Sequence, residues 1–287
     1  MQVLPDGHVH TEWSWDAVAG SMELSCARAV ELGLPSIAFT DHADYTRWAV
    51  TREMRAVRGG RVAPDGRFSP PPFDAQGYLA CVQRCRDRYP GLRILSGTEL
   101  GEPHWHAGEV RDLLSRGGFD RVLGSVHSLA LDGPWLVDHL FDRLGPDGLM
   151  RAYLEEVLRL ADSAAPFAVL AHIDYPVRHW PETAGRFDAT AYEDEYRAAL
   201  GALARSGRAL EVNTVVPLPA VVVRWWYEAG GAELTFGSDA HRPAVVAWEF
   251  ARAAAMAEAA GFRPGRHPHD IWRRGQARVG FSAATRE

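Results

Sequence analysis

Residues 35–42 read PSIAFTDH, a short apolar run that ends in an aspartate and a histidine. The residues before it, 22–32, place apolar side chains at helical spacing and stop at Gly33. Short apolar runs bounded by glycine or proline are typical of buried strands in α/β proteins. This stretch therefore predicts a helix followed by a buried strand, with Asp41 and His42 where the strand ends.

The same alternation runs through the rest of the chain. Strand-like apolar segments occupy residues 2–10, 35–40, 92–98, 119–126, 167–171, 208–213 and 233–237. Segments with helical spacing occupy residues 22–32, 74–89, 147–163, 189–206, 217–228 and 243–260. About seven strand–helix units indicate an α/β fold with a parallel sheet. No glycine-rich phosphate loop follows the first strand, as it would in a Rossmann sheet, which favours a closed barrel.

Length and composition suit one domain that spans residues 1–287. Apolar residues make up 47% of the chain and charged residues 24%, as in ordinary globular domains. The formal net charge of −6 argues against nucleic acid or an anionic membrane as a partner. With three cysteines, no signal-peptide pattern and no apolar run near the ~20 residues of a membrane span, we expect a cytoplasmic protein with reduced thiols. Residues 43–72 are expected to form an insertion or lid, and residues 261–287 a surface tail.

Residue types that bind metals follow every predicted strand. They are His8 and His10, Asp41 and His42, Glu99, His127, His172, Glu211 and Asn213, and Asp239 and His241. A single histidine after a strand is usually structural, but such residue types are scarce in buried strands, and here they follow all seven. The carboxyl ends of barrel strands meet on one face, where active sites lie. The pattern therefore predicts a site for several metal ions on that face.

These residues lie in motifs that occur in a fixed order along the chain. The motifs are HVHTEWSWD (8–16), FTDHADY (39–45), GTELGE (97–102), GSVHSL (124–129), AHIDYP (171–176), EVNT (211–214) and FGSDAHRP (236–243). Together they resemble the PHP (polymerase and histidinol phosphatase) superfamily, most closely its monofunctional histidinol-phosphate phosphatases. The resemblance implies a distorted TIM-like (βα)7 barrel with a three-metal centre at the carboxyl ends of the strands.

The resemblance also implies which residues hold each ion. His8, His10, Glu99 and Asp239 would hold the first, Asp16, His42 and His241 the second, and Glu99, His127 and His172 the third. Asp41 and Glu102 would lie behind these ligands, Asp41 as a partner that fixes an imidazole tautomer. Mixed imidazole and carboxylate ligands suit Zn²⁺, Mn²⁺ or Fe²⁺, so we expect two or three divalent ions of this kind.

The implied reaction is hydrolysis of a small phosphomonoester, with histidinol phosphate as the expected substrate. A metal-bound hydroxide would attack phosphorus, and no protein nucleophile is needed. Arg178, Arg242 and Arg47 are candidates for binding the phosphate. His104, His106 and His179 are candidates for protonating the leaving alkoxide.

One departure from the family pattern keeps other substrates open. Histidinol-phosphate phosphatases typically carry a segment like NTSGLR after the sixth strand, whereas Asn213 is followed here by TVVPLP. A nucleotide or a sugar phosphate is therefore the alternative substrate, and a non-catalytic PHP module is a third possibility that the complete ligand set disfavours. Tryptophans beside the motif loops could wall the mouth of the site and stack a ring; they are Trp13, Trp15, Trp48, Trp105 and Trp180.

Overall fold

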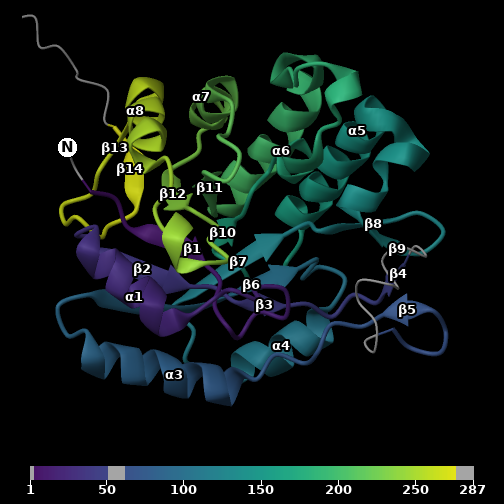
Figure 1. Cartoon of the computed structure of the whole chain (residues 1–287). Coiled ribbons are helices and arrows are strands. Elements are labelled where there is room, and N and C mark those ends of the chain that lie inside the picture. Colours follow the sequence, from purple (N-terminus) through teal and green to yellow (C-terminus); the bar gives the residue numbers. More distant parts are fainter. Residues whose placement is uncertain (1–2, 51–61, 276–287) are drawn as a thin grey trace, which may run out of the picture.

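The computed structural model describes residues 3–50 and 62–275. Parallel strands form the centre of the molecule (Figure 1), in the order β1-β2-β6-β7-β10-β11-β12. Their bounds are Asp6–Val9 (β1), Ser36–Phe39 (β2), Arg93–Gly101 (β6), Arg121–Ser125 (β7), Val169–Leu170 (β10), Ala209–Asn213 (β11) and Glu233–Gly237 (β12). All seven predicted strands are confirmed, and they are neighbours in the same order as in the sequence.

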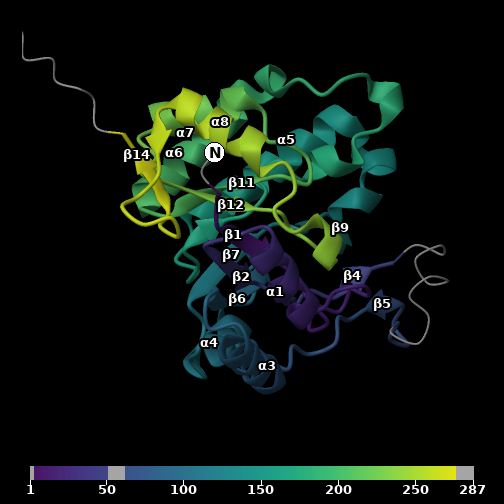
Figure 2. The ribbon, with the colours of Figure 1, turned by 60° about the vertical axis from the view of Figure 1, so that its left-hand side comes forward.

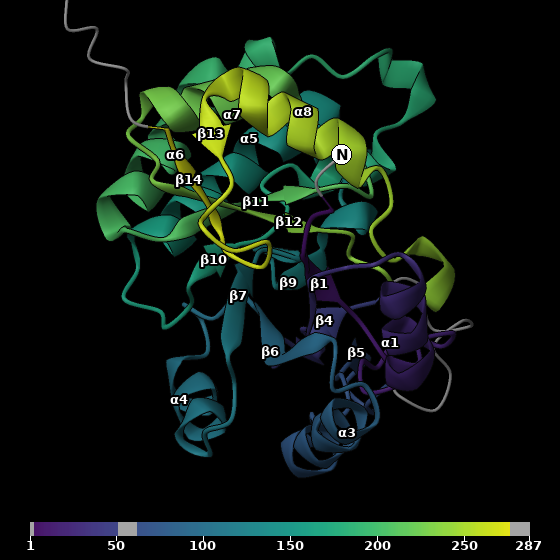
Figure 3. The same cartoon turned by 90° about the vertical axis from the view of Figure 1, so that its left-hand side faces the viewer.

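A helix follows each of these strands along the chain. The helices are Met22–Glu31 (α1), Ala75–Arg88 (α3), Ala107–Ser115 (α4), Phe141–Asp162 (α5), Glu193–Ser206 (α6), Ala220–Glu228 (α7) and Phe250–Ala260 (α8). Figure 3 shows α3 and α4 on one side of the strands and α7 and α8 on the opposite side. The largest apolar cluster fills the space between α5–α8 and the strands β10–β12.

The barrel is distorted where its first and last strands meet. The Asp239 amide donates to the His8 carbonyl at 2.8 Å, and the His10 amide donates to the Ala240 carbonyl at 2.9 Å. These bonds join β1 to the residues just after β12. The amino-terminal half of β12 pairs instead with the antiparallel strand β14 (Trp272–Arg274), which pairs with β13 (Phe262–Arg263). The distorted α/β barrel expected from the sequence is therefore confirmed.

Several helix predictions are corrected by the structure. Helix α4 was not predicted. The segment 243–260 is not one helix, because Ala247 and Glu249 have positive φ angles of 57° and 55° and separate the 3-10 helix Pro243–Val245 from α8. Helix α7 begins at Ala220 rather than at 217, after Pro219 takes an extended conformation as its N-cap.

Short hairpins stand at the mouth of the barrel. Strands β4 (Trp48–Ala49) and β5 (Arg67–Phe68) form one of them, and β8 (Ser128–Ala130) and β9 (Pro134–Leu136) form the other. The first hairpin lies beside β9 (Figure 2), and Trp48, Phe68 and Leu136 pack into one apolar cluster. The first hairpin belongs to the predicted insertion 43–72, of which residues 51–61 lie outside the described part.

The predicted tail 261–287 is only partly a surface segment. Its first part adds β13 and β14 to the sheet, with Phe262 and Trp272 buried; residues 276–287 lie outside the described part. Within residues 3–50 and 62–275, no helix combines the length and the apolar character needed to cross a membrane.

Candidate metal centre

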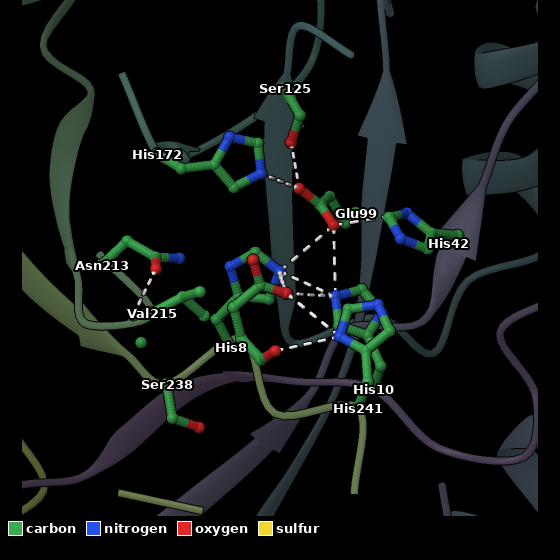
Figure 4. Close-up of polar contacts among 12 residues, drawn as sticks. His8, His10, His42, Glu99, Ser125, His172, Asn213, Val215, Ser238 and His241 are labelled. Atoms are coloured by element: carbon green, nitrogen blue, oxygen red, sulfur yellow. Dashed lines mark hydrogen bonds and ion pairs between the residues drawn. The ribbon is translucent and has the colours of Figure 1, made fainter. Parts of the chain in front are cut away.

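Imidazole and carboxylate side chains converge at the carboxyl ends of the strands (Figure 4). β1 delivers His8 and His10 from one face of the strand, because side chains two apart point the same way. β6 delivers Glu99, and His172 follows β10 in an unusual backbone conformation with a φ of 22°. All four side chains are buried.

The first group consists of His8, His10, Glu99 and Asp239, whose ligand atoms lie within 4.8 Å of one another. The His8 and His10 Nε2 atoms are 3.0 Å apart. His8 Nε2 is 3.1 Å from a Glu99 oxygen, and His10 Nε2 is 3.0 Å from Asp239 Oδ1. This is the set of residues predicted for the first ion.

Hydrogen-bond acceptors behind His8 and His10 fix which ring nitrogen of each histidine carries the proton. Glu211 Oε1 lies 2.8 Å from His8 Nδ1. Ser14 donates its hydroxyl proton to Asp41 at 2.8 Å, so its oxygen is free to accept from His10 Nδ1 at 2.9 Å. With protons on both Nδ1 atoms, two Nε2 lone pairs face each other and nearby carboxylates. That arrangement is repulsive unless a cation lies between them, so the donor set fits a metal ion.

The third group, Glu99, His127 and His172, is also brought together as predicted. Glu99 Oε1 lies 2.7 Å from His172 Nε2 and 3.3 Å from His127 Nε2. The other Glu99 oxygen faces His8, at 3.1 Å. Glu99 therefore connects two groups, which is the arrangement expected of a bridging carboxylate.

The second predicted group lies nearer the surface. Asp16 Oδ2 is 3.3 Å from His42 Nε2 and 3.5 Å from His241 Nε2. The Asp16 side chain is 30% exposed and the His241 side chain 35% exposed, whereas His42 is buried. Ring nitrogens of His10, His42 and His241 also lie within 4.8 Å of one another, so the structure groups His10 with the two outer histidines.

Asp44 belongs to the cluster and was missed in the sequence. It forms a fourth group with His42 and His127, and one of its oxygens is buried without a hydrogen bond. Its other oxygen accepts a hydrogen bond from Trp15 Nε1 at 2.8 Å. Asp44 lies two residues after His42, which is the same spacing that singled out His8 and His10, so the signal was present.

Glu102 supports the site without facing the groups. Its two oxygens accept hydrogen bonds from the His127 and Ser128 amides at 2.6 and 2.8 Å and from the Thr46 hydroxyl at 2.8 Å. A carboxylate saturated in this way holds the His127 backbone in place. Glu211, which was noted only as a strand end, has the same kind of role, since its second oxygen accepts from the His172 amide at 3.0 Å.

Charge is balanced closely inside the cluster. Burial opposes ionisation of Glu99, yet His8, His127 and His42 hold its pKa well below the usual range. Burial likewise opposes ionisation of Asp239, and Arg178 and His8 lower its pKa. Burial lowers the pKa of His172 to about 4, so its imidazole is neutral near pH 7. In the absence of an ion, burial opposes protonation of His8 and His127, yet the nearby carboxylates raise their pKa well above the usual value. The ionised carboxylates and the neutral His172 are in the state that binds divalent metals, and His8 and His127 would give up a proton to an ion.

A cavity of about 130 Å³ opens onto the cluster. Ligand candidates from all the groups line it, together with Arg178, Asp138, Trp15, Trp48 and Tyr175. Arg178 Nη2 lies 2.5 Å from Asp239 Oδ2, and its guanidinium stacks 4.9 Å from the Tyr175 ring centre.

Other predicted substrate residues lie elsewhere. Arg47 pairs with Asp65 at 2.6 Å, and Arg242 is exposed and does not line the cavity. His104 Nε2 bonds Glu156 at 2.6 Å, and His106 Nε2 bonds the Thr46 hydroxyl at 2.7 Å. Neither histidine lines the cavity, and the exposed His179 does not line it either.

Comparisons with known proteins show which proteins this chain resembles. A probable histidinol-phosphatase from Deinococcus radiodurans is 30% identical over 88% of this chain and 92% of the relative. A probable histidinol-phosphatase from Thermotoga maritima is 26% identical, over 82% and 83% of the two chains. The crystal structure of histidinol phosphate phosphatase from Lactococcus lactis, with zinc, L-histidinol and phosphate, matches with a TM-score of 0.73 at 21% identity, over 91% of this chain and 94% of that one. The PHP domain model matches residues 6–215, and the chain therefore belongs to the PHP domain family.

Proposed function

We propose that this protein is a metal-dependent phosphatase that hydrolyses histidinol phosphate to histidinol and phosphate. One observation carries the proposal: Glu99 joins groups of buried imidazoles and carboxylates beside a cavity that Arg178 also lines. The relatives support the substrate, because two are named probable histidinol-phosphatases and the Lactococcus lactis structure holds zinc, histidinol and phosphate.

In this proposal the three sets of residues expected from the sequence hold two or three divalent ions. His8, His10, Glu99 and Asp239 would hold one, Glu99, His127 and His172 another, and Asp16, His42 and His241 the outermost. Imidazole and carboxylate donors suit Zn²⁺, Mn²⁺ or Fe²⁺. Bound ions of this kind lower the pKa of water and neutralise charge on phosphoryl oxygens.

Arg178 is the residue that would bind the phosphate. It is the one arginine among the described residues that line the cavity, and it is 16% exposed. Asp239 and the Tyr175 ring hold its guanidinium in place. Burial opposes the charged form of Arg178, but the Asp239 carboxylate favours it, and the pKa of Arg178 is raised. A guanidinium has five N–H donors, so Arg178 can keep Asp239 and still donate to a phosphoryl oxygen.

Hydrolysis joins the oxygen of water to phosphorus and breaks the phosphorus–oxygen bond to the alcohol. The leaving alkoxide then takes up a proton. His104 and His106 are engaged outside the cavity. His179 is exposed and does not line the cavity either, so water in the site would supply this proton.

A panel of phosphomonoesters tests the proposal. We expect protein loaded with Zn²⁺ or Mn²⁺ to release phosphate from histidinol phosphate with the highest kcat/KM, and a chelator to abolish the activity. Metal-loaded protein that hydrolyses no ester in the panel would contradict the proposal.

A second substrate class stays in the panel because of the loop after β11. Arg224, the first arginine after Asn213, lies on α7 and does not line the cavity beside the metal cluster. If a nucleotide or a sugar phosphate is hydrolysed with the highest kcat/KM, the reaction class stands and the substrate changes.

A further inference from the structure

The cavity beside the metal cluster contains one carboxylate that the cluster does not use. Among the described residues that line it, Asp16, Asp44, Glu99 and Asp239 each lie within 4 Å of a cluster histidine. Asp138 does not; its carboxylate is 3.4 Å from the neighbouring His139 and also interacts electrostatically with His179. The Asp138 carboxylate is 30% exposed, and within residues 3–50 and 62–275 no group donates a hydrogen bond to it.

The backbone holds Asp138 at a fixed distance from the metal cluster. It lies in the short 3-10 helix Val137–His139, directly after β9. The Val137 amide donates to the carbonyl of His127 at 2.9 Å, and the Leu140 amide donates to Val137 at 3.0 Å. Val137 itself is fully buried. The backbone beside Asp138 is therefore hydrogen-bonded to the backbone of His127, a proposed metal ligand.

Aromatic rings form another part of the cavity wall. Trp15, Trp48 and Tyr175 line the same cavity. Both indole N–H groups are bound inside the protein, Trp15 to Asp44 at 2.8 Å and Trp48 to Ser128 Oγ at 2.6 Å. The wall therefore offers ring surface rather than hydrogen-bond donors, and ring faces attract organic cations.

We propose that Asp138 selects substrates whose alcohol carries a cationic group, an organic ammonium or an imidazolium. This inference rests on the proposed function. The phosphate would lie against Arg178 and the candidate metal ligands. Asp138 is then the lining carboxylate left to pair with the alcohol. Charge complementarity thus places the positive end of the substrate opposite Asp138.

The test compares two substrates in one variant. In Asp138→Asn, kcat/KM for histidinol phosphate should fall about 10- to 100-fold, mainly through KM, because a charge-assisted hydrogen bond is lost. The kcat/KM for p-nitrophenyl phosphate, whose alcohol has no cation, should stay unchanged. Asp142→Asn is the matched control, since its carboxylate is exposed and outside the cavity; it should match wild type on both substrates.

A binding measurement separates this inference from the proposed function. By calorimetry, L-histidinol should bind Asp138→Asn about 10- to 100-fold more weakly than wild type, while inorganic phosphate binds both equally. Equal losses on both substrates, or unchanged L-histidinol affinity, would overturn the role of Asp138. Wild-type protein that binds L-histidinol through Asp138 but hydrolyses no phosphomonoester would overturn the proposed function alone.

Discussion

At the scale of single residues, the histidines depend on carboxylates behind them. Glu211 holds the Nδ1 proton of His8 at 2.8 Å and the amide of His172 at 3.0 Å. Burial favours the protonated acid, yet His8 lowers the pKa of Glu211, so the carboxylate is ionised near pH 7. An anionic partner raises the basicity of a metal-binding imidazole.

Glu211→Gln should therefore weaken metal binding by about 10- to 100-fold while the protein stays folded. Zn²⁺ affinity measured by competition with a chromogenic chelator checks this. Glu182→Gln, an exposed change outside the cavity, is the control and should bind Zn²⁺ as wild type does. A wild-type Zn²⁺ affinity in Glu211→Gln would show that His8 does not need the charge.

Arg178 gives the second prediction at this scale. Arg178→Ala should lower kcat/KM for the phosphomonoester by about 10- to 100-fold, because a charge-assisted hydrogen bond contributes about 1.5–3 kcal/mol. Metal content should not fall, since arginine is not a ligand. Arg178→Lys should recover the loss only in part, because lysine cannot bind an oxyanion bidentately. Full activity in Arg178→Ala would leave phosphate binding to the metals.

At the scale of elements, helix α5 contains a break that one glycine makes possible. Gly145 has φ 68° and ψ 163°, inside a helix that otherwise runs from Phe141 to Asp162. That conformation is essentially restricted to glycine. Pro146 follows it and restarts the helix at a position that tolerates proline.

Two alanine substitutions three residues apart should act in opposite directions. Nothing lies within 4 Å of the Cβ position of Gly145, so an added methyl group would meet no clash. Gly145→Ala should therefore destabilise the protein through backbone strain alone, by about 1–3 kcal/mol. Gly148→Ala lies in regular helix, where its Cβ would meet Leu144 at an ordinary 3.8 Å, and should stabilise by up to about 1 kcal/mol. Urea unfolding of both variants measures this. A neutral Gly145→Ala would mean that the helix adjusts without the break.

At the scale of the whole molecule, the candidate metal site joins segments that lie far apart in the sequence. Its groups draw on β1, β3 (His42–Ala43) and β6 and on residues after β7, β10 and β12. An ion that binds only the folded state stabilises it by mass action.

Protein purified without chelator should carry two or three divalent ions, and chelation should lower Tm by roughly 10 °C, as expected for about 4 kcal/mol of linked binding. Elemental analysis and thermal unfolding check both. Less than one ion per chain and an unchanged Tm would contradict a metal cluster.

His127→Ala and His172→Ala should stay folded with weak activity, because each leaves a three-ligand group incomplete.

Closure of the barrel gives a pH-dependent prediction. Asp6 accepts hydrogen bonds from Ser238 at 3.0 and 2.6 Å and from the Ala247 amide at 2.9 Å, which ties β1 to the residues after β12. Burial raises the pKa of Asp6 from 3.8 to about 6. Between these values the folded state holds a proton that the unfolded state has lost, so stability falls as pH rises.

In metal-free protein, the unfolding free energy of wild type minus that of Asp6→Asn should decrease from pH 4 to pH 6, by at most about 1.4 kcal/mol per pH unit. Above that window the difference should level off. Taking the difference removes the titration of the other groups. A difference that rises with pH in this window would mean that the hydrogen bonds outweigh burial and lower the pKa of Asp6.

Sequence by itself determined the barrel and most of the candidate site. Apolar runs such as residues 36–39 of β2 can be read locally because a parallel strand covered on both faces is rich in apolar side chains. Residues such as His8, Glu99 and His172 could be assigned to one face because parallel strands bring their carboxyl ends together whatever the loops do.

Only the tertiary structure decided which side chains in the loops reach the cavity. Arg47 and Arg178 both lie in connections that follow barrel strands, Arg178 in the 3-10 helix Tyr175–His179, but Arg47 pairs with Asp65 while Arg178 pairs with Asp239. The relay from Asp41 through Ser14 to His10 likewise depends on a contact between residues 27 apart. Such contacts follow from how distant segments pack, and neither local spacing nor residue type specifies them.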